Sequence, residues 1–182
     1  MCDVTCRHME GRRGTVPLSD FRKAGNRMFG LGKKKKLAVS APAKGKIIDI
    51  TEVEDEVFAS RTMGDGFAVE PEGDTLVAPC DGMVAMVADT LHAVVIEKEG
   101  VQILLHIGLD TVELQGKGFE ALVLQGDMVK RGDALVRFDR DCIGQAGKPL
   151  TTMLVVTNMD VVSSLKKDLS NPAEVLSLEI KN

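Results

Sequence analysis

The sequence predicts an all-β fold, a sandwich or barrel of short antiparallel strands with one or two short helices. From Leu37 onward, short apolar runs alternate with Gly, Pro and Asp, which is the pattern of such folds. The sequence Ala-Pro-x-x-Gly occurs twice, at residues 41–45 and 78–82, each time between two strand-like segments. Only residues 158–167 of this part have a helical pattern, so strands and tight turns must build the core.

Charge divides the 182 residues into a basic tail, residues 1–36, and an acidic domain, residues 37–182. The tail holds 10 Lys and Arg against 3 Asp and Glu, whereas the domain holds 13 against 24. The domain is long enough to bury a core of its own. The chain has no Trp and no Tyr, and therefore no aromatic platform that would predict a nucleic-acid partner.

The basic tail is expected to be largely disordered, with one amphipathic helix. Residues 1–17 are polar and show no periodicity. In the segment that follows, one helical face is shared by Leu18, Phe21, Gly25, Met28 and Phe29, and four lysines come next. Two interpretations stand side by side: residues 18–36 rest on an anionic membrane surface, or they are a solvated linker. The sequence leaves open whether translation starts at Met28.

The cysteines indicate a cytoplasmic protein. Cys2, Cys6, Cys80 and Cys142 do not form a disulfide framework, and no signal peptide is visible. No apolar run is long enough to span a membrane. Cys2 and Cys6 with His8 are too few ligands to predict a metal site.

The stretch from Leu91 to Asp110 predicts a hairpin that brings two histidines together. Strands are expected at 91–97 and 101–107, joined by a three-residue loop ending in Gly100. In this register His92 faces His106 directly, with Cβ atoms about 4.5–5.5 Å apart, unless a longer loop or a bulge offsets the pair. Side chains alternate between the two faces of a strand. The face with the histidines is therefore expected to carry Val94, Ile96, Gln102 and Leu104, and the other face Ala93, Val95, Ile103 and Leu105.

Two more turn-and-strand segments and one helix follow the hairpin. The Gly-Asp pairs at 126–127 and 132–133 predict tight turns, each followed by a strand. Residues 158–167 predict a helix capped by Asn158 or Asp160, and residues 175–180 predict the last strand.

A facing imidazole pair beside Thr90 and Asp110 indicates a functional site, and two kinds of chemistry fit it. One is metal ligation by His92, His106 and Asp110. The other is covalent catalysis, in which one imidazole is the nucleophile and the other assists. Two imidazoles in contact disfavour double protonation, so at least one keeps a lone pair at pH 7. A nucleotide kinase is excluded because the chain has no Gly-rich phosphate loop, and no Ser lies in a nucleophile elbow.

A longer motif around His106 narrows the class of protein to which the histidine pair belongs. The sequence His106-Ile-Gly-Leu-Asp-Thr-Val-Glu-Leu114 stands with Thr90-x-His92, Met63-Gly-Asp-Gly66, the second Ala-Pro-x-x-Gly segment and Thr157-Asn-Met-Asp160. In these motifs, residues 40–181 resemble the glucose-type IIA proteins of the bacterial phosphoenolpyruvate-dependent sugar phosphotransferase system. The resemblance implies a barrel-sandwich hybrid fold and a phosphotransferase without metal or cofactor. It implies that His106 takes phosphate from phospho-HPr for a IIB cysteine of a IIBC sugar permease, that His92 assists and that Thr90 orients His92.

The resemblance also implies a docking surface around His106. Its apolar members would be Val57, Phe58, Met63, Leu104 and Val112, edged by Asp55 and Asp110 for a partner with a basic rim. A core position is the alternative for these apolar residues, most of all for Leu104. Two departures from the family pattern are Leu91 and Glu56, where polar and hydrophobic residues, respectively, are common.

Two other classes remain as alternatives. A lipoyl or biotinyl carrier would place its lysine at a hairpin tip, as Lys98 is placed, but Glu97 and Glu99 flank it. A zinc-binding or metal-dependent hydrolase would use the same histidines but has no clear third strong ligand. The transported sugar, the permease, the regulatory targets and the oligomeric state are not readable from the sequence.

Overall fold

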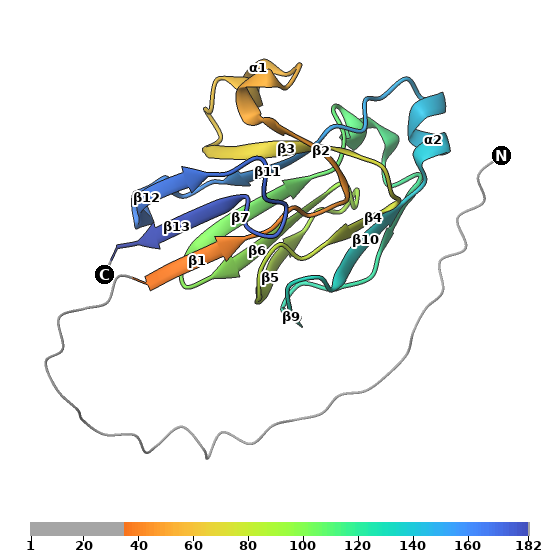
Figure 1. Ribbon diagram of the computed structural model, residues 1–182. Coiled ribbons are helices and arrows are strands. Elements are labelled where there is room, and N and C mark those ends of the chain that lie inside the picture. The colour runs from red at the N-terminus through yellow and green to blue at the C-terminus, as the bar shows by residue number, and fades with distance from the viewer. Residues whose placement is uncertain (1–34, 182) are drawn as a thin grey trace, which may run out of the picture. The chain divides into compact units, whose positions relative to one another are not determined.

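The computed structural model describes residues 35–181, and these form the domain expected from the sequence (Figure 1). The disordered segment expected at 1–17 and the amphipathic helix expected after it lie outside the described residues. The expected boundary after residue 36 shifts slightly, because Lys35 and Lys36 already belong to the first strand, β1 (Lys35–Val39). No helix of the described residues is long and apolar enough to cross a membrane.

The largest sheet has seven strands and carries the histidine hairpin near its middle. Its order is β2 (Gly45–Asp49), β3 (Asp65–Pro71), β11 (Thr152–Val156), β7 (Val101–His106), β6 (Ala93–Lys98), β5 (Gly82–Val87) and β9 (Met128–Val129). All of its pairings are antiparallel.

Two three-stranded sheets complete the architecture, and both are antiparallel. One contains β1, β13 (Leu176–Ile180) and β12 (Val162–Lys167), and the other contains β4 (Thr75–Val77), β10 (Ala134–Phe138) and β8 (Phe119–Ala121). The α-helices of the described chain are short: α1 (Glu56–Ala59) and α2 (Arg140–Gln145). The antiparallel sandwich with one or two short helices is thereby confirmed.

The seven-stranded sheet is apolar on both faces, which places the histidine hairpin between two hydrophobic clusters. Alternate residues such as Phe67, Ile103 and Leu154 point into the main core. The opposite face contributes Ile48, Ala68, Met153 and Val155 to a smaller cluster, which also contains Phe58 of α1 and Ile50, Val53 and Leu109. His106 lies on this second face, because it pairs with Met153 across β7 and β11.

The two Ala-Pro-x-x-Gly segments form tight connections, β1 to β2 and β4 to β5, as expected. They also bond to each other: the Ser40 N–H donates to the Pro79 carbonyl at 2.9 Å, and the Val77 N–H donates to the Pro42 carbonyl at 2.8 Å. Backbone hydrogen bonds therefore join each repeated segment to the residue just before the other.

The prediction of a helix at residues 158–167 is wrong. A single 3-10 turn, η3 (Met159–Val161), leads into strand β12, whose residues pair with β13. Val162, the first residue of β12, is β-branched and suits a strand better than a helix. Asn158 does not cap a helix: its side chain accepts from the Gln102 N–H at 2.8 Å and donates to the Gly100 carbonyl at 2.7 Å, which ties it to the histidine hairpin.

Gly66 in β3 allows the close approach of β11, and substituting it should destabilise the domain. A Cβ at this position would lie 1.8 Å from the Leu154 carbonyl oxygen. Gly66→Ala is therefore expected to lower the free energy of unfolding by about 3 kcal/mol, the upper end of the usual cost of overpacking, because the added atom meets backbone. Gly73→Ala, with no atom within 4 Å of the added Cβ, is the control and should change it by less than about 0.5 kcal/mol in chemical denaturation. Equal stability of the two variants would contradict this prediction.

Candidate active site

The hairpin that carries the histidines has a different register from the expected one. Its loop has two residues, Glu99 and Gly100, with φ of 55° and 81°, and Lys98 pairs with Val101. Two consecutive positive φ angles form the tight turn that matches strand twist, and a final Gly suits this turn as well as a longer loop. The one-residue difference places Ala93, not His92, opposite His106.

His92 nevertheless meets His106, because it lies just outside the regular strand. Strand β6 begins at Ala93, and Leu91 has a φ of 58°, so the chain bends before the strand starts. The His92 carbonyl accepts from the Ile107 N–H at 2.8 Å. The two imidazole centroids are 4.8 Å apart at an interplanar angle of 78°. The predicted proximity is confirmed, but the predicted face of β6 is wrong: Val94 and Ile96 belong to the main core.

The ring of His106 is held so that one particular nitrogen is available. Nδ1 lies 2.9 Å from the Gly108 carbonyl oxygen, an acceptor only, so Nδ1 carries the proton and donates. In the neutral imidazole this leaves the lone pair on Nε2. Gly108 has a φ of 73°, and a Cβ there would lie 2.5 Å from Thr111 Cγ2. The buried Thr111 hydroxyl donates to the Ile107 carbonyl, which closes the loop around His106.

Thr90 orients the second ring. Its hydroxyl lies 2.6 Å from Nδ1 of His92, as the sequence motif led us to expect. The bond fixes the plane of the ring and leaves the other nitrogen of His92 for a different partner.

Burial keeps both imidazoles neutral. Burial, reinforced by the neighbouring His92, lowers the pKa of His106 to about 4, although the Gly108 carbonyl, Asp55 and Asp110 act in the opposite direction. Burial also lowers the pKa of His92 below 6.5. At pH 7 the site therefore presents an uncharged Nε2 on His106.

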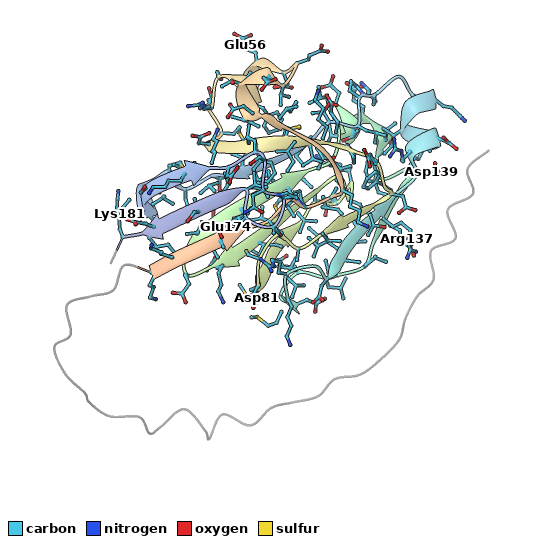
Figure 2. The ribbon with its side chains drawn as sticks, viewed as in Figure 1. Glu56, Asp81, Arg137, Asp139, Glu174 and Lys181 are labelled. Carbon is cyan, nitrogen blue, oxygen red and sulfur yellow. The ribbon has the colours of Figure 1, made fainter. Side chains whose placement is uncertain are left out.

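Phe58 of α1 packs against His106 as a second ring neighbour. The Phe58 and His106 centroids are 5.3 Å apart at 60°. The Asp55 carboxylate caps α1 by accepting from the N–H groups of Val57 and Phe58, at 2.9 and 3.2 Å. Glu56, the departure from the family pattern, points outward from α1 (Figure 2) and does not interrupt the contact.

A cluster of four charges anchors the chain just after α1. Lys167 Nζ lies 2.9 Å from Asp49 and 2.7 Å from Asp65, and Arg61 lies 3.7 and 3.5 Å from the same carboxylates. Burial alone would raise the pKa of Asp49, but the bonds from Lys167 and Thr51 outweigh it and lower this pKa to about 2. These ion pairs tie the segment that presents Phe58 to β2, β3 and β12.

The residues expected to form the docking surface fall into two groups. Val57, Met63 and Val112 are 51%, 40% and 49% exposed, so they are accessible to a partner. Phe58 and Leu104 are buried, each 8% exposed. Leu104 is a core residue, which agrees with the alternative stated for it above. Phe58 instead contacts the ring of His106.

Asp110 lies at the edge of the site, where it forms an ion pair with Lys148, a residue that the sequence did not indicate. Asp110 is exposed, has a φ of 54° and precedes η2 (Thr111–Leu114). Its carboxylate lies 3.9 Å from Nζ of Lys148, which also bonds to Glu113 at 2.7 Å. Lys148 lies 38 positions beyond Asp110 outside any motif, so no signal in the sequence connects it to the histidines.

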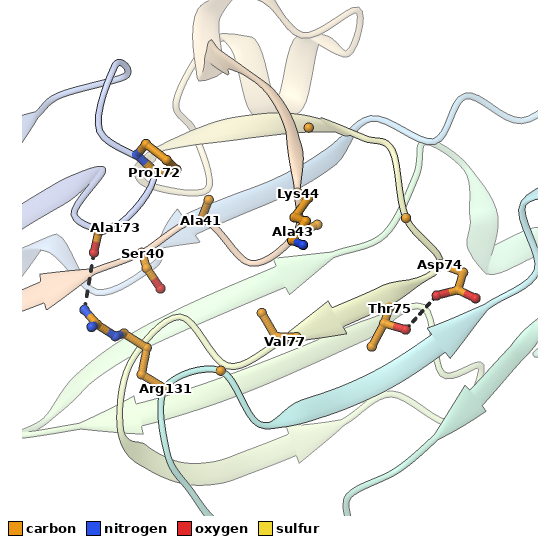
Figure 3. Close-up of a pocket in the computed structure, with 13 residues that line it drawn as sticks. Ser40, Ala41, Ala43, Lys44, Asp74, Thr75, Val77, Arg131, Pro172 and Ala173 are labelled. Carbon is orange, nitrogen blue, oxygen red and sulfur yellow. Dashed lines mark hydrogen bonds between the residues drawn. The ribbon is translucent and has the colours of Figure 1, made fainter.

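A separate hollow lies away from the histidines. It has a volume of about 690 Å³, and Figure 3 shows Ala41, Ala43 and Val77 among the residues that line it, with Arg131 and Asp74. Arg131 donates to the Ala173 carbonyl at 3.3 Å across one side. No residue of the histidine site lines it, so it does not belong to the same chemistry.

The fold and the site together define a class: a β-sandwich protein with a half-buried, neutral histidine and a second imidazole in contact with it. Comparison with known proteins names the family. Residues 37–162 match the family model described as phosphoenolpyruvate-dependent sugar phosphotransferase system, EIIA 1. The chain belongs to this family, and it is a phosphocarrier component of sugar uptake by that system.

Individual relatives agree with this assignment. The chain is 42% identical over 156 residues to the PTS system glucose-specific EIIA component of Bacillus cereus, covering 85% of this chain and 94% of that one. It is 46% identical over 123 residues to the glucose-specific EIICBA component of Staphylococcus carnosus, covering 67% of this chain and 18% of that protein. The solved structure of glucose permease IIA from Mycoplasma capricolum superposes with a TM-score of 0.67 at 38% identity, over 85% and 94% of the two chains.

Proposed function

We propose that His106 accepts the phosphoryl group of phospho-HPr and passes it to a cysteine of a IIB domain, in the cytoplasm. The observation that carries the proposal is the state of His106: a neutral imidazole whose Nδ1–H is held by the Gly108 carbonyl, with the Nε2 lone pair left available. The EIICBA relative, in which IIA and IIB are named in one component, supports a IIB partner.

Acceptance is a displacement at phosphorus. The Nε2 lone pair of His106 forms the new N–P bond while the N–P bond of the donor breaks, and its electron pair stays on the donor nitrogen. His106 keeps its Nδ1 proton throughout, so the step needs no added base. Onward transfer repeats the displacement, with a thiolate as nucleophile and Nε2 as leaving group.

His92 is proposed to steady the charge that moves through the site. With Nδ1 bound to the Thr90 hydroxyl, its other nitrogen can donate toward the phosphoryl oxygens on His106, 4.8 Å away between ring centroids. A donor aimed at developing negative charge in a partly buried site is worth more than one in water.

The accessible residues Val57, Met63 and Val112 are proposed to form the apolar part of the docking surface. The carboxylates of Asp55 and Asp110 supply negative charge beside it, which suits a partner with a basic rim. The same carboxylates disfavour a bound phosphoryl group, which keeps the adduct transferable.

Incubation with phosphoenolpyruvate, enzyme I and HPr tests the proposal. We expect a mass gain of one phosphoryl group, measured without acid, and a phosphoramidate that is labile in acid and stable in base. EDTA should not prevent labelling. Labelling on a cysteine, or labelling that requires a metal, would contradict the proposal.

The pH dependence should follow the low pKa of His106. His106 is expected to titrate near pH 4 by NMR, and the acceptance rate should lose its dependence on this group above about pH 5. The unfolded chain binds a proton here near pH 6.5, so between pH 6.5 and 4 it binds more protons than the folded state. The free energy of unfolding should therefore fall as pH falls through this range. A His106 pKa at or above 6.5 would contradict the burial argument.

The alternatives have less support. Across residues 35–181, no group of three or more His, Cys, Asp and Glu side chains is arranged to hold a metal, so the set of His92, His106 and Asp110 does not form a ligand cluster. Lys98 ends β6 beside the two-residue turn, but the Bacillus cereus and Staphylococcus carnosus relatives are glucose-specific components of the phosphotransferase system, not lipoyl or biotinyl carriers. Membrane contact through residues 18–36 remains a separate proposal, which vesicle binding by the full chain would test.

A further inference from the structure

The loop that holds His106 is supported from outside by a segment distant in sequence. Pro149 accepts from the Leu109 N–H at 3.0 Å through its carbonyl oxygen. A Cβ on Gly108 would lie 2.8 Å from the same oxygen, so the two backbones are in close contact. The Gly108 carbonyl accepts from Nδ1 of His106, so the contact with Pro149 also helps to fix the position of the His106 ring.

Lys148, next to Pro149, places a positive charge at the edge of the site. Its ammonium group lies 2.7 Å from Glu113, within η2, and 3.9 Å from Asp110, the residue before η2. The Lys148 side chain is only 19% exposed, whereas those of Asp110 and Glu113 are 69% and 65% exposed. The hydrogen bond with Glu113 raises the pKa of Lys148, so the charge is present at pH 7.

The positive charge of Lys148 would affect the electrostatic environment of a phosphoryl group at His106. Asp110 is close enough to act electrostatically on His106, and its negative charge would repel an incoming phosphoryl group. Lys148 offsets that repulsion. The side chain of Asp110 makes no capping hydrogen bond to η2. Among the described residues, the ion pair with Lys148 therefore also restrains the Asp110 side chain.

We propose that Lys148 is a positioning residue for phosphoryl acceptance: it acts through Asp110 and Glu113 to restrain the loop from Gly108 to Glu113 and to offset the carboxylate charge beside His106. The inference rests on the proposed function of His106. It gives a role to a lysine that belongs to none of the motifs of the histidine site.

The substitution Lys148→Met tests the proposal. We expect the maximal acceptance rate from phospho-HPr to fall at least tenfold. The apparent KM for this donor should stay equal or decrease, because the docking surface becomes more acidic. The pKa of His106, measured by NMR, should rise, since the charge of Asp110 is no longer offset.

Three further variants separate charge from structure. Lys148→Arg should restore the rate to within about threefold. Lys148→Gln keeps a donor for Glu113 without the charge and should be as slow as Lys148→Met. Lys46→Met is the matched control: it removes one charge from an ion pair with Glu70, at 3.6 Å, on strands β2 and β3, and should leave rate and pKa unchanged.

The outcomes distinguish this inference from the function on which it rests. If wild type is not labelled, the proposed function fails. If wild type and Lys46→Met are labelled, and Lys148→Gln accepts phosphate at the wild-type rate with an unchanged His106 pKa, the role of Lys148 is wrong and the phosphohistidine proposal stands. Lys148→Gln therefore decides the question even if Lys148→Met does not fold.

Discussion

Replacing His106 with Gln is expected to abolish labelling from phospho-HPr. An amide has no nucleophilic nitrogen, so the displacement at phosphorus cannot begin. Gln is close in size to His and can remain in contact with Phe58 and His92, so thermal unfolding should show a folded domain. Intact mass under non-acidic conditions, after incubation with phosphoenolpyruvate, enzyme I and HPr, is the measurement.

The third histidine of the sequence provides the control for this result. His8→Gln should be labelled as fully as the wild type, because His8 belongs to none of the motifs around the histidine pair. If His106→Gln still gains a phosphoryl group, the acceptor is another residue and the assignment of His106 is wrong.

Replacing His92 with Gln should separate the two halves of the relay. We expect labelling of His106 to persist, because the Nε2 nucleophile is untouched and Gln keeps one donor near the phosphoryl oxygens. Onward transfer to a IIB domain should slow by roughly a hundredfold or more, the size expected for loss of a charge-stabilising donor. Single-turnover transfer from the labelled protein to an isolated IIB domain measures this step.

Two comparisons make the His92 result interpretable. Thr90→Val removes the hydroxyl that orients His92, at 2.6 Å, and should slow onward transfer in the same direction but by a smaller factor. If His92→Gln instead blocked labelling and left onward transfer unchanged, His92 would serve acceptance, contrary to the proposal.

Local patterns were enough for much of the fold. Gly, Pro and Asp between short apolar runs predicted an all-β domain, and the repeated Ala-Pro-x-x-Gly segments predicted two strand connections that the structure contains. The pattern misled at residues 158–167, where spacing compatible with a helix concealed a strand. Pairing with β13 decided that segment, and a single sequence does not display such long-range pairing.

At the site, the sequence alone determined which residue types are available: two histidines one hairpin apart, with Thr90, Gly108 and Asp110 at fixed offsets. Only the tertiary structure decided how they meet. The two-residue turn moved the register by one, and the bend at Leu91 returned His92 to its partner. Burial and the neighbouring His92 lower the pKa of His106, and residues 148–149 bring Lys148 to the edge of the site. Burial and cross-strand charge are properties of tertiary packing, so no local pattern encodes them.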